Sequence, residues 1–120
     1  MHILLVDDDE DQRRTMCKFL VDRGHTVQDV SNGIRALLYL DDRVDVIISD
    51  IQMPGLDGIE MLRTIRERYL DLPVILMTGH GTLDTAIAAL RNRAFDYLSK
   101  PVALDELLAC IRRIEENRKT

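Results

Sequence analysis

The stretch Val44-Asp45-Val46-Ile47-Ile48-Ser49 indicates the fold class of this chain. It is almost continuously apolar over the length of a β-strand, which is typical of a strand covered on both faces in a parallel sheet. Four other short apolar runs recur along the sequence, at Ile3–Val6, Thr26–Val30, Pro73–Met77 and Phe95–Leu98. The sequence therefore predicts five strands, several of them covered on both faces, with the third at Val44–Ser49.

Segments with helical spacing lie between and after these runs. The first follows the acidic Asp9-Glu10-Asp11 and ends at Gly24. Thr82 is a candidate N-cap of the fourth helix, and Ser31 or Asn32 could cap the second. The apolar positions that carry the spacing are Met16, Phe19 and Leu20; Ala36, Leu37 and Leu40; Ile59, Leu62, Ile65 and Tyr69; Leu83, Ala86, Ile87 and Leu90; and Leu104, Leu107, Leu108, Ile111 and Ile114. Strand and helix alternate five times, which predicts an α/β sandwich with right-handed crossovers.

The composition fits one domain over residues 1–120, with 46% hydrophobic and 31% charged residues. The net charge of -5 argues against direct nucleic-acid binding by this domain, which would need a basic face. No apolar run is long enough to span a bilayer, so no membrane segment is expected. Cys17 and Cys110 stand far apart, and we expect two reduced thiols in a cytoplasmic protein, with a disulfide or a catalytic thiol as the alternatives.

Charged and polar residues follow four of the predicted strands. Asp7-Asp8-Asp9 follow the first strand, Asp50 the third, Thr78 the fourth and Lys100 the fifth. Ligands of open α/β sheets bind beyond the carboxyl ends of the strands, so these side chains are expected on one rim. Clustered carboxylates stay ionised when a cation offsets them, and an all-oxygen set favours Mg²⁺.

Phosphoryl transfer is the chemistry that such a rim suits. A carboxylate such as Asp50 can act as a nucleophile and carry an aspartyl phosphate. Lys100 would neutralise one phosphoryl oxygen, and the Thr78 hydroxyl would donate to another. Each residue also has a simpler interpretation, because acids after a strand often cap the next helix. Thr78 could likewise be a cap, and Lys100 a solvated charge.

Taken together, these residues resemble the receiver domain of two-component response regulators. The matching motifs are Val6-Asp7-Asp8-Asp9, the loop from Asp50 to Gly58, Met77-Thr78-Gly79-His80, and Phe95 to Pro101. The resemblance implies a flavodoxin-like three-layer sandwich in which a parallel sheet of order 2-1-3-4-5 is surrounded by five helices. The segments Gly79–Thr82 and Ala94–Tyr97 look most like receivers attached to enhancer-binding transcriptional activators.

The resemblance also implies what the residues do. Asp50 would take a phosphoryl group from a histidine kinase or a histidine phosphotransfer protein, in a signalling switch rather than a turnover enzyme. Asp7, Asp8 and Asp50 would hold Mg²⁺ together with the main-chain carbonyl of Gln52, and Asp9 would remain a helix cap. The bond before Pro101 would be cis.

A conformational switch follows from the same resemblance. Thr78 would move toward the phosphoryl group, and Tyr97 would turn inward; its simpler interpretation is an aromatic on an edge strand. An output domain or partner would read the face formed by the fourth helix, the fifth strand and the fifth helix, and a homodimer is a further option. Gln52 and His80 would tune the phosphoryl lifetime, unless they are merely surface residues of a loop.

One turn departs from the family pattern, because Asn92-Arg93 stands where family members often place Gly before Ala94-Phe95-Asp96-Tyr97. Gly at a left-handed helix cap avoids a strain of about 1 kcal/mol. Our hypothesis is that Asn92 adopts the left-handed conformation or that the helix ends differently.

Two competing functions remain at this point. A haloacid-dehalogenase-like phosphatase would use Asp7 as its nucleophile, although Asp11 stands where that family places Thr or Val. A receiver-like interaction module that never accepts phosphate would usually lack the acidic pair, the acceptor or the lysine. Phosphate on Asp7 would favour the first, and no phosphate on any residue would favour the second.

Overall fold

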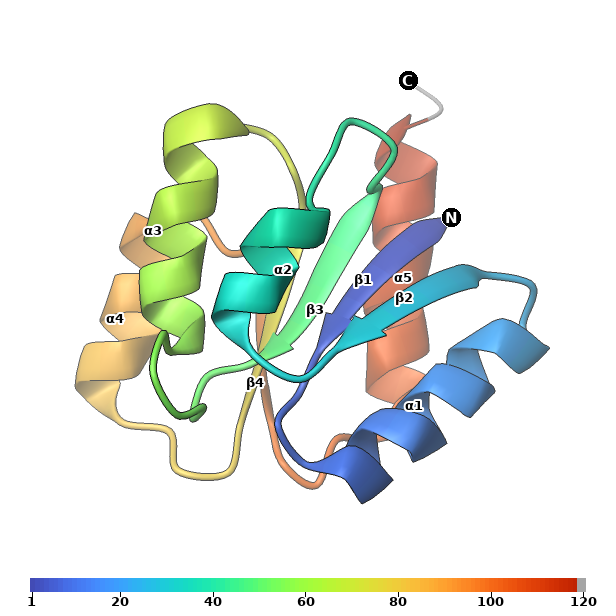
Figure 1. Ribbon diagram of the computed structural model, residues 1–120, viewed down its shortest axis with the longest axis horizontal. Helices are drawn as coiled ribbons and strands as arrows, with labels where there is room; N and C mark the ends of the chain where they lie inside the picture. The colour runs from blue at the N-terminus through green and yellow to red at the C-terminus, as the bar shows by residue number, and fades with distance from the viewer. Residues whose placement is uncertain (119–120) are drawn as a thin grey trace.

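The computed structural model describes residues 1–118, in which five strands and five helices alternate (Figure 1). Their bounds are β1 (His2–Val6), α1 (Glu10–Asp22), β2 (Thr26–Val30), α2 (Gly33–Tyr39), β3 (Val46–Asp50), α3 (Gly58–Arg68), β4 (Val74–Thr78), α4 (Leu83–Arg91), β5 (Asp96–Ser99) and α5 (Leu104–Arg118). The strands form one parallel sheet in the order β2-β1-β3-β4-β5. The predicted sandwich and strand order are confirmed.

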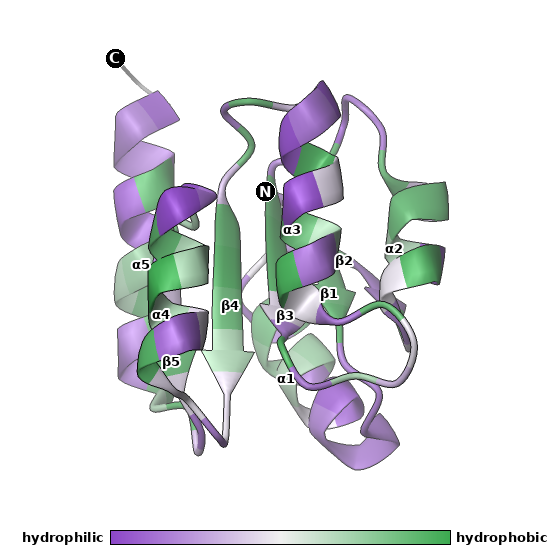
Figure 2. Ribbon diagram, turned by 90° about the vertical axis from the view of Figure 1, so that its left-hand side faces the viewer, coloured by the Kyte–Doolittle hydropathy of each residue, from purple (hydrophilic) through white to green (hydrophobic). Residues whose placement is uncertain are grey.

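The sheet lies between two layers of helices. Helices α1 and α5 cover one face, and α2, α3 and α4 cover the other (Figure 1). Ile47 packs into the core beneath α2 and α3, whereas its neighbours Val46 and Ile48 pack toward α1 and α5. Strand β4 is likewise hydrophobic along its length (Figure 2). Both faces exclude water, which is why these strands lack the alternation of half-exposed strands.

Three strands begin later than the sequence predicted. Strand β3 starts at Val46 because the Val44 amide donates to the Asp41 carbonyl oxygen in a preceding turn, at 3.2 Å. Strands β4 and β5 are each shifted by one residue. As a result Asp50 and Thr78 are the last residues of their strands, paired with Met77 and Ser99. The sheet itself therefore fixes the backbone of both residues.

Side-chain caps start the helices. The Asp9 carboxylate accepts from the Gln12 amide at 3.0 Å, as expected for a helix cap. Asn32, and not Ser31, caps α2, and Thr82 caps α4 as predicted. Gly24 ends α1 in a left-handed conformation, with φ at 89°.

The buried face of α4 is not the one that the spacing of its large residues predicted. Leu83 and Leu90 are 75% and 77% exposed, whereas Ala89 is buried. Ala88 and Ala89 pack into the core that α3 shares, because their small side chains let the helix approach closely. The spacing of Leu83, Ala86, Ile87 and Leu90 identified the helix, but its large residues Leu83 and Leu90 lie on the exposed side.

The turn after α4 does contain a left-handed residue, but the residue is Arg93 rather than Asn92. Arg93 has φ at 58°, and Asn92 has φ at −95°. Asn92 stays in line with the helix because its side-chain amide donates to the Ala88 carbonyl oxygen at 2.8 Å. The Ala94 amide then donates to the Ala89 carbonyl oxygen, which places the left-handed position on the residue between them.

A buried guanidinium supports this strained turn. Arg66 of α3 donates to the carbonyl oxygens of Asn92 and Arg93, at 3.0 and 2.9 Å, and to that of Tyr69 at 3.0 Å. A cation at the carboxyl ends of two helices satisfies carbonyls that have no partner within their own helix. These bonds offset the strain of about 1 kcal/mol expected at Arg93.

Both cysteines are free thiols, as the sequence predicted. Burial raises the pKa of Cys110 to about 12, and the hydrogen bond from its Sγ to Asp96 acts in the same direction. Such a thiol is a poor nucleophile at neutral pH, which argues against a catalytic role. No helix within residues 1–118 is long and apolar enough to cross a membrane.

Candidate functional site

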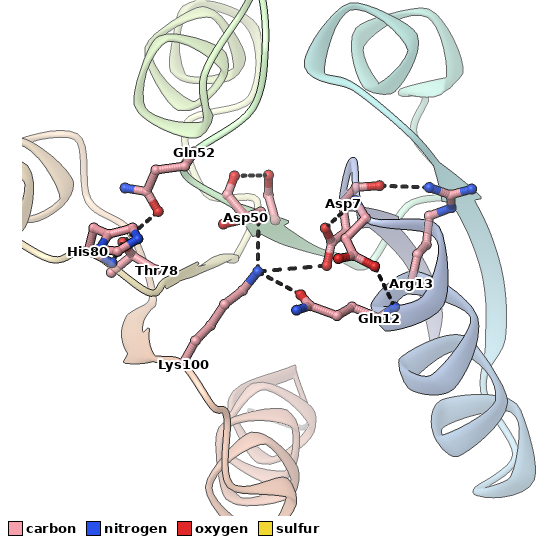
Figure 3. A network of polar contacts seen from close by, with 10 residues as sticks. Asp7, Gln12, Arg13, Asp50, Gln52, Thr78, His80 and Lys100 are labelled. Atoms are coloured by element: carbon pink, nitrogen blue, oxygen red, sulfur yellow. Dashed lines mark hydrogen bonds and ion pairs between the residues drawn. The ribbon is translucent and has the colours of Figure 1, made fainter.

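The candidate site lies at the carboxyl ends of four strands (Figure 3). Asp7 directly follows β1, Asp50 ends β3, Thr78 ends β4 and Lys100 directly follows β5. Their side chains converge on one rim although as many as 93 positions in the chain separate them. The sequence predicted this gathering, because parallel strands present their carboxyl ends at one edge.

Asp50 and Lys100 form the centre of the rim. Lys100 Nζ lies 2.8 Å from Asp50 Oδ2 and 3.9 Å from Asp7 Oδ2. Asp50 is only 5% exposed, and its Oδ1 is buried without a hydrogen-bond partner among the residues described. Buried carboxylate oxygens are nearly always satisfied, so this atom is suited to an additional electrophile or cation.

Three carboxylates could share a cation at this rim. Asp7, Asp8 and Asp50 each offer an oxygen, and the three atoms lie within 4.8 Å of one another. Burial raises the pKa of Asp7, an effect opposed by the Asp9 amide, which donates to its Oδ1 at 2.9 Å, and by the charge of Lys100. The charged form of Asp7 is therefore costly unless a further positive charge is close. This oxygen-only set fits a hard cation such as Mg²⁺.

The loop after Asp50 is held by close backbone packing at its far end. A Cβ at Gly58 would lie 2.5 Å from the Asp50 carbonyl oxygen and 2.8 Å from Ile51 Cα, so only glycine fits. Asp57 and Glu60 form a capping box that starts α3 at this point. Gly55 makes the turn with φ at 78°. The loop is thus held at Asp50 by the sheet and at Gly58 by close backbone packing.

The Thr78 hydroxyl forms hydrogen bonds with residues other than Asp50. Its hydroxyl donates to Gln52 Oε1 at 2.8 Å and accepts from the His80 amide at 3.1 Å (Figure 3). The Gln52 side chain therefore holds the predicted switch residue, a contact that sequence reasoning missed. Gln52 and His80 were predicted to tune the phosphoryl lifetime and Thr78 to act as a switch, and the three residues form one hydrogen-bonded group.

Tyr97 is half-buried and reaches α4. Its hydroxyl lies 2.8 Å from Thr85 Oγ1, and its ring packs against the core beneath α3 and α4. A Cβ at Gly81 would lie 2.8 Å from the Tyr97 hydroxyl oxygen, so the missing side chain of Gly81 makes room for this position. Thr85 was not among the predicted site residues, because nothing in its sequence context distinguishes it from a first-turn capping residue.

Comparison with known proteins bears directly on this arrangement. Residues 3–112 match the family described as the response regulator receiver domain. The chain belongs to this family. The receiver fold is also seen in the crystal structure of a response regulator receiver domain protein from Clostridium thermocellum, with a TM-score of 0.92, 34% identity, and 98% and 96% of the two chains covered. The resemblance predicted from the motifs is confirmed, and the phosphatase alternative is set aside.

The receiver also has relatives among transcriptional regulators. It is 42% identical over 118 residues to the C4-dicarboxylate transport transcriptional regulatory protein DctD of Rhizobium meliloti (strain 1021), covering 98% of this chain and 26% of that protein. It is 42% identical over 112 residues to the DNA-binding transcriptional regulator NtrC of Escherichia coli (strain K12), covering 92% and 24%. These matches agree with the narrower resemblance to receivers of transcriptional activators. The chain spans about a quarter of the length of these relatives.

The family places this receiver among the signalling switches of two-component systems. The bond between Lys100 and Pro101 is cis, the geometry that the resemblance implied. Gln12 is a second residue that sequence reasoning missed: its side chain reaches Lys100 from α1, across 88 positions of the chain. No motif marks it, since it is simply the third residue after the cap Asp9.

Proposed function

We propose that this receiver accepts a phosphoryl group on Asp50, with Mg²⁺ held beside it. The observation that supports this most strongly is the state of the Asp50 carboxylate. One oxygen is neutralised by Lys100 Nζ at 2.8 Å, and the other is buried without a hydrogen bond among the described residues. A purely structural aspartate would have both oxygens satisfied.

The transfer requires one bond to form and one to break. An Asp50 carboxylate oxygen attacks phosphorus, and the bond between phosphorus and the donor atom breaks, with its electron pair leaving on the donor. The donor would be a phosphohistidine of a kinase or phosphotransfer protein, or a small acyl phosphate. Lys100 is placed to offset the charge of the phosphoryl oxygens, since its ammonium already lies against the acceptor.

The metal would be held by carboxylate oxygens of Asp7, Asp8 and Asp50, which lie close together. The resemblance to receiver domains adds the main-chain carbonyl of Gln52 as a further ligand. When bound, Mg²⁺ offsets negative charge on the transferring phosphoryl oxygens. The cost of burying Asp7 in its charged form supports the proposal, because a divalent cation removes that cost.

Switching would begin with Thr78. Its hydroxyl has to leave Gln52 Oε1 to donate to a phosphoryl oxygen on Asp50. Tyr97 would then fill the space that Thr78 vacates, and the equilibrium would shift by the difference in phosphoryl contacts between the two packings. The output would be read on the face of α4, β5 and α5, by an attached domain, a partner protein or a second copy of the chain. These events would take place in the cytoplasm.

Phosphorylation of Asp50 is directly testable by mass spectrometry. Wild-type protein incubated with Mg²⁺ and acetyl phosphate is expected to gain the mass of one phosphoryl group, and Asp50→Ala is expected to gain none. Removing Mg²⁺ with a chelator should abolish the gain, because the carboxylates would be left without an offsetting charge. A wild-type protein without mass gain would indicate a receiver-like module that never accepts phosphate. An equal gain in Asp50→Ala would place the phosphoryl group on another residue and overturn the proposal.

The phosphoryl lifetime provides a separate prediction. Gln52→Ala removes the acceptor that competes for the Thr78 hydroxyl, so phosphate loss is expected to slow by about threefold. His80→Ala keeps the amide that donates to Thr78, so any change in its rate reports the imidazole ring alone. Gln28→Ala, on the exposed side of the edge strand β2, is the matched control. Equal rates in wild type, Gln52→Ala and His80→Ala would rule out lifetime tuning by these residues.

A further inference from the structure

We infer that Gln12 is a positioning residue for Lys100, an inference that rests on the proposed phosphorylation of Asp50. Lys100 Nζ donates to Gln12 Oε1 at 2.9 Å, on the side of the ammonium that faces α1 (Figure 3). Within residues 1–118, Gln12 is the one neutral side chain that accepts from this ammonium; its other partners are the carboxylates of Asp50 and Asp7.

The ammonium donates hydrogen bonds to Asp50 and Gln12, whereas Asp7 lies at an ion-pair distance of 3.9 Å. Both carboxylates belong to the group that would hold the metal. Without the amide acceptor, the flexible lysine side chain would be drawn between Asp7 and Asp50, into the space where the proposed cation would bind. The neutral amide of Gln12 holds the ammonium beside Asp50 Oδ2 without adding negative charge.

The start of α1 is itself anchored, so Gln12 has a fixed base from which to reach Lys100. The Asp9 carboxylate accepts from the Gln12 amide at 3.0 Å. On the next residue, Arg13 Nη1 donates to the Asp7 carbonyl oxygen at 2.8 Å, and its Nε donates to Asp29 Oδ2 at 3.0 Å. These bonds tie the first turn of α1 to the ends of β1 and β2.

Gln12 and Lys100 also line one pocket. Its other polar side chains are those of Asp7, Asp11 and Thr15, and its apolar lining includes Met16, Met77, Val102 and Leu104. Within residues 1–118 neither Asp11 nor Thr15 accepts a hydrogen bond from the Lys100 ammonium, so the amide of Gln12 supplies its one neutral acceptor.

A double-mutant cycle tests the inference. Gln12→Met keeps the length of the side chain and removes its acceptor, so phosphorylation by acetyl phosphate is expected to slow by about three- to tenfold. In a Lys100→Met background the same substitution is expected to have no further effect, because the group it positions is gone. Gln28→Met is the matched control and should phosphorylate at the wild-type rate. An equal slowing by Gln12→Met in both backgrounds would overturn the inference, since it would show a general disturbance of α1.

Urea unfolding of wild type, Gln12→Met, Lys100→Met and the double variant separates this inference from the proposed function. Coupling between the two substitutions in unfolding midpoints is expected, and it requires no phosphate. If wild type takes no phosphate, the proposed function fails, and the unfolding cycle alone decides the contact. Additive effects in that cycle would overturn the positioning of Lys100 by Gln12, whatever the phosphorylation assay gives.

Discussion

Lys100→Met is expected to slow phosphorylation of Asp50 by about 100-fold. The ammonium lies 2.8 Å from Asp50 Oδ2 and is the one cationic group of the described residues that contacts this oxygen. Methionine keeps the unbranched side chain but offers no charge to the phosphoryl oxygens. The rate of mass gain with acetyl phosphate and saturating Mg²⁺ would measure the loss.

Lys18→Met is the appropriate control for this substitution. Lys18 is exposed on α1, so its replacement removes the same charge from the chain without changing the rim. Its phosphorylation rate should equal that of wild type. If Lys100→Met took phosphate as fast as Lys18→Met, the ammonium would have no part in the transfer, and the bond to Asp50 would be structural.

Gly58→Ala is expected to destabilise the fold by about 3 kcal/mol. The added methyl would lie 2.5 Å from the Asp50 carbonyl oxygen and 2.8 Å from Ile51 Cα. Both neighbours are backbone atoms, so neither can move aside as a side chain would. Either α3 shifts outward or the end of β3 is displaced, and both changes lower the midpoint of urea unfolding.

Gly79→Ala is a matched glycine replacement on the same rim. Its new Cβ would meet only Lys100 Cβ, at 3.9 Å, an ordinary van der Waals contact. Its unfolding midpoint should stay close to that of wild type. A midpoint for Gly58→Ala as high as that for Gly79→Ala would mean that the acceptor loop adapts to a side chain at no cost.

The alternation of strands and helices could be predicted from the residues because the central strands β1, β3 and β4 are buried on both faces, whereas the strand order came from the resemblance to receiver domains. A run such as Val46-Ile47-Ile48 has few other stable placements, and the ends of the strands locate the rim. The buried face of α4 could not be predicted in the same way, because small residues and not large apolar ones form it. Helical spacing gives weight to large residues such as Leu83 and Leu90, whereas the contact is made by Ala88 and Ala89.

The residues of the rim were predictable where a strand end or a motif marks them. Contacts between side chains were not, because they depend on the rotamers that the packed site selects. The bond between Thr78 and Gln52 joins residues 26 positions apart, and that between Gln12 and Lys100 spans 88 positions. The left-handed turn was expected, but its placement on Arg93 depended on the side-chain bond of Asn92.

The two ends of α4 differ in how they are held, because Arg66 anchors only the carboxyl end. At the carboxyl end, its guanidinium ties the carbonyls of Asn92 and Arg93 to the end of α3. At the amino end, the helix begins at Leu83, two residues after Gly81, which contacts the proposed switch residues Thr78 and Tyr97. We therefore expect any displacement of α4 that starts at the rim to be largest at Thr82 and smallest at Arg93, because Arg66 anchors the far end of the helix. A protein docked near the rim would meet a moving surface, and one docked at the far end would meet a stationary reference point.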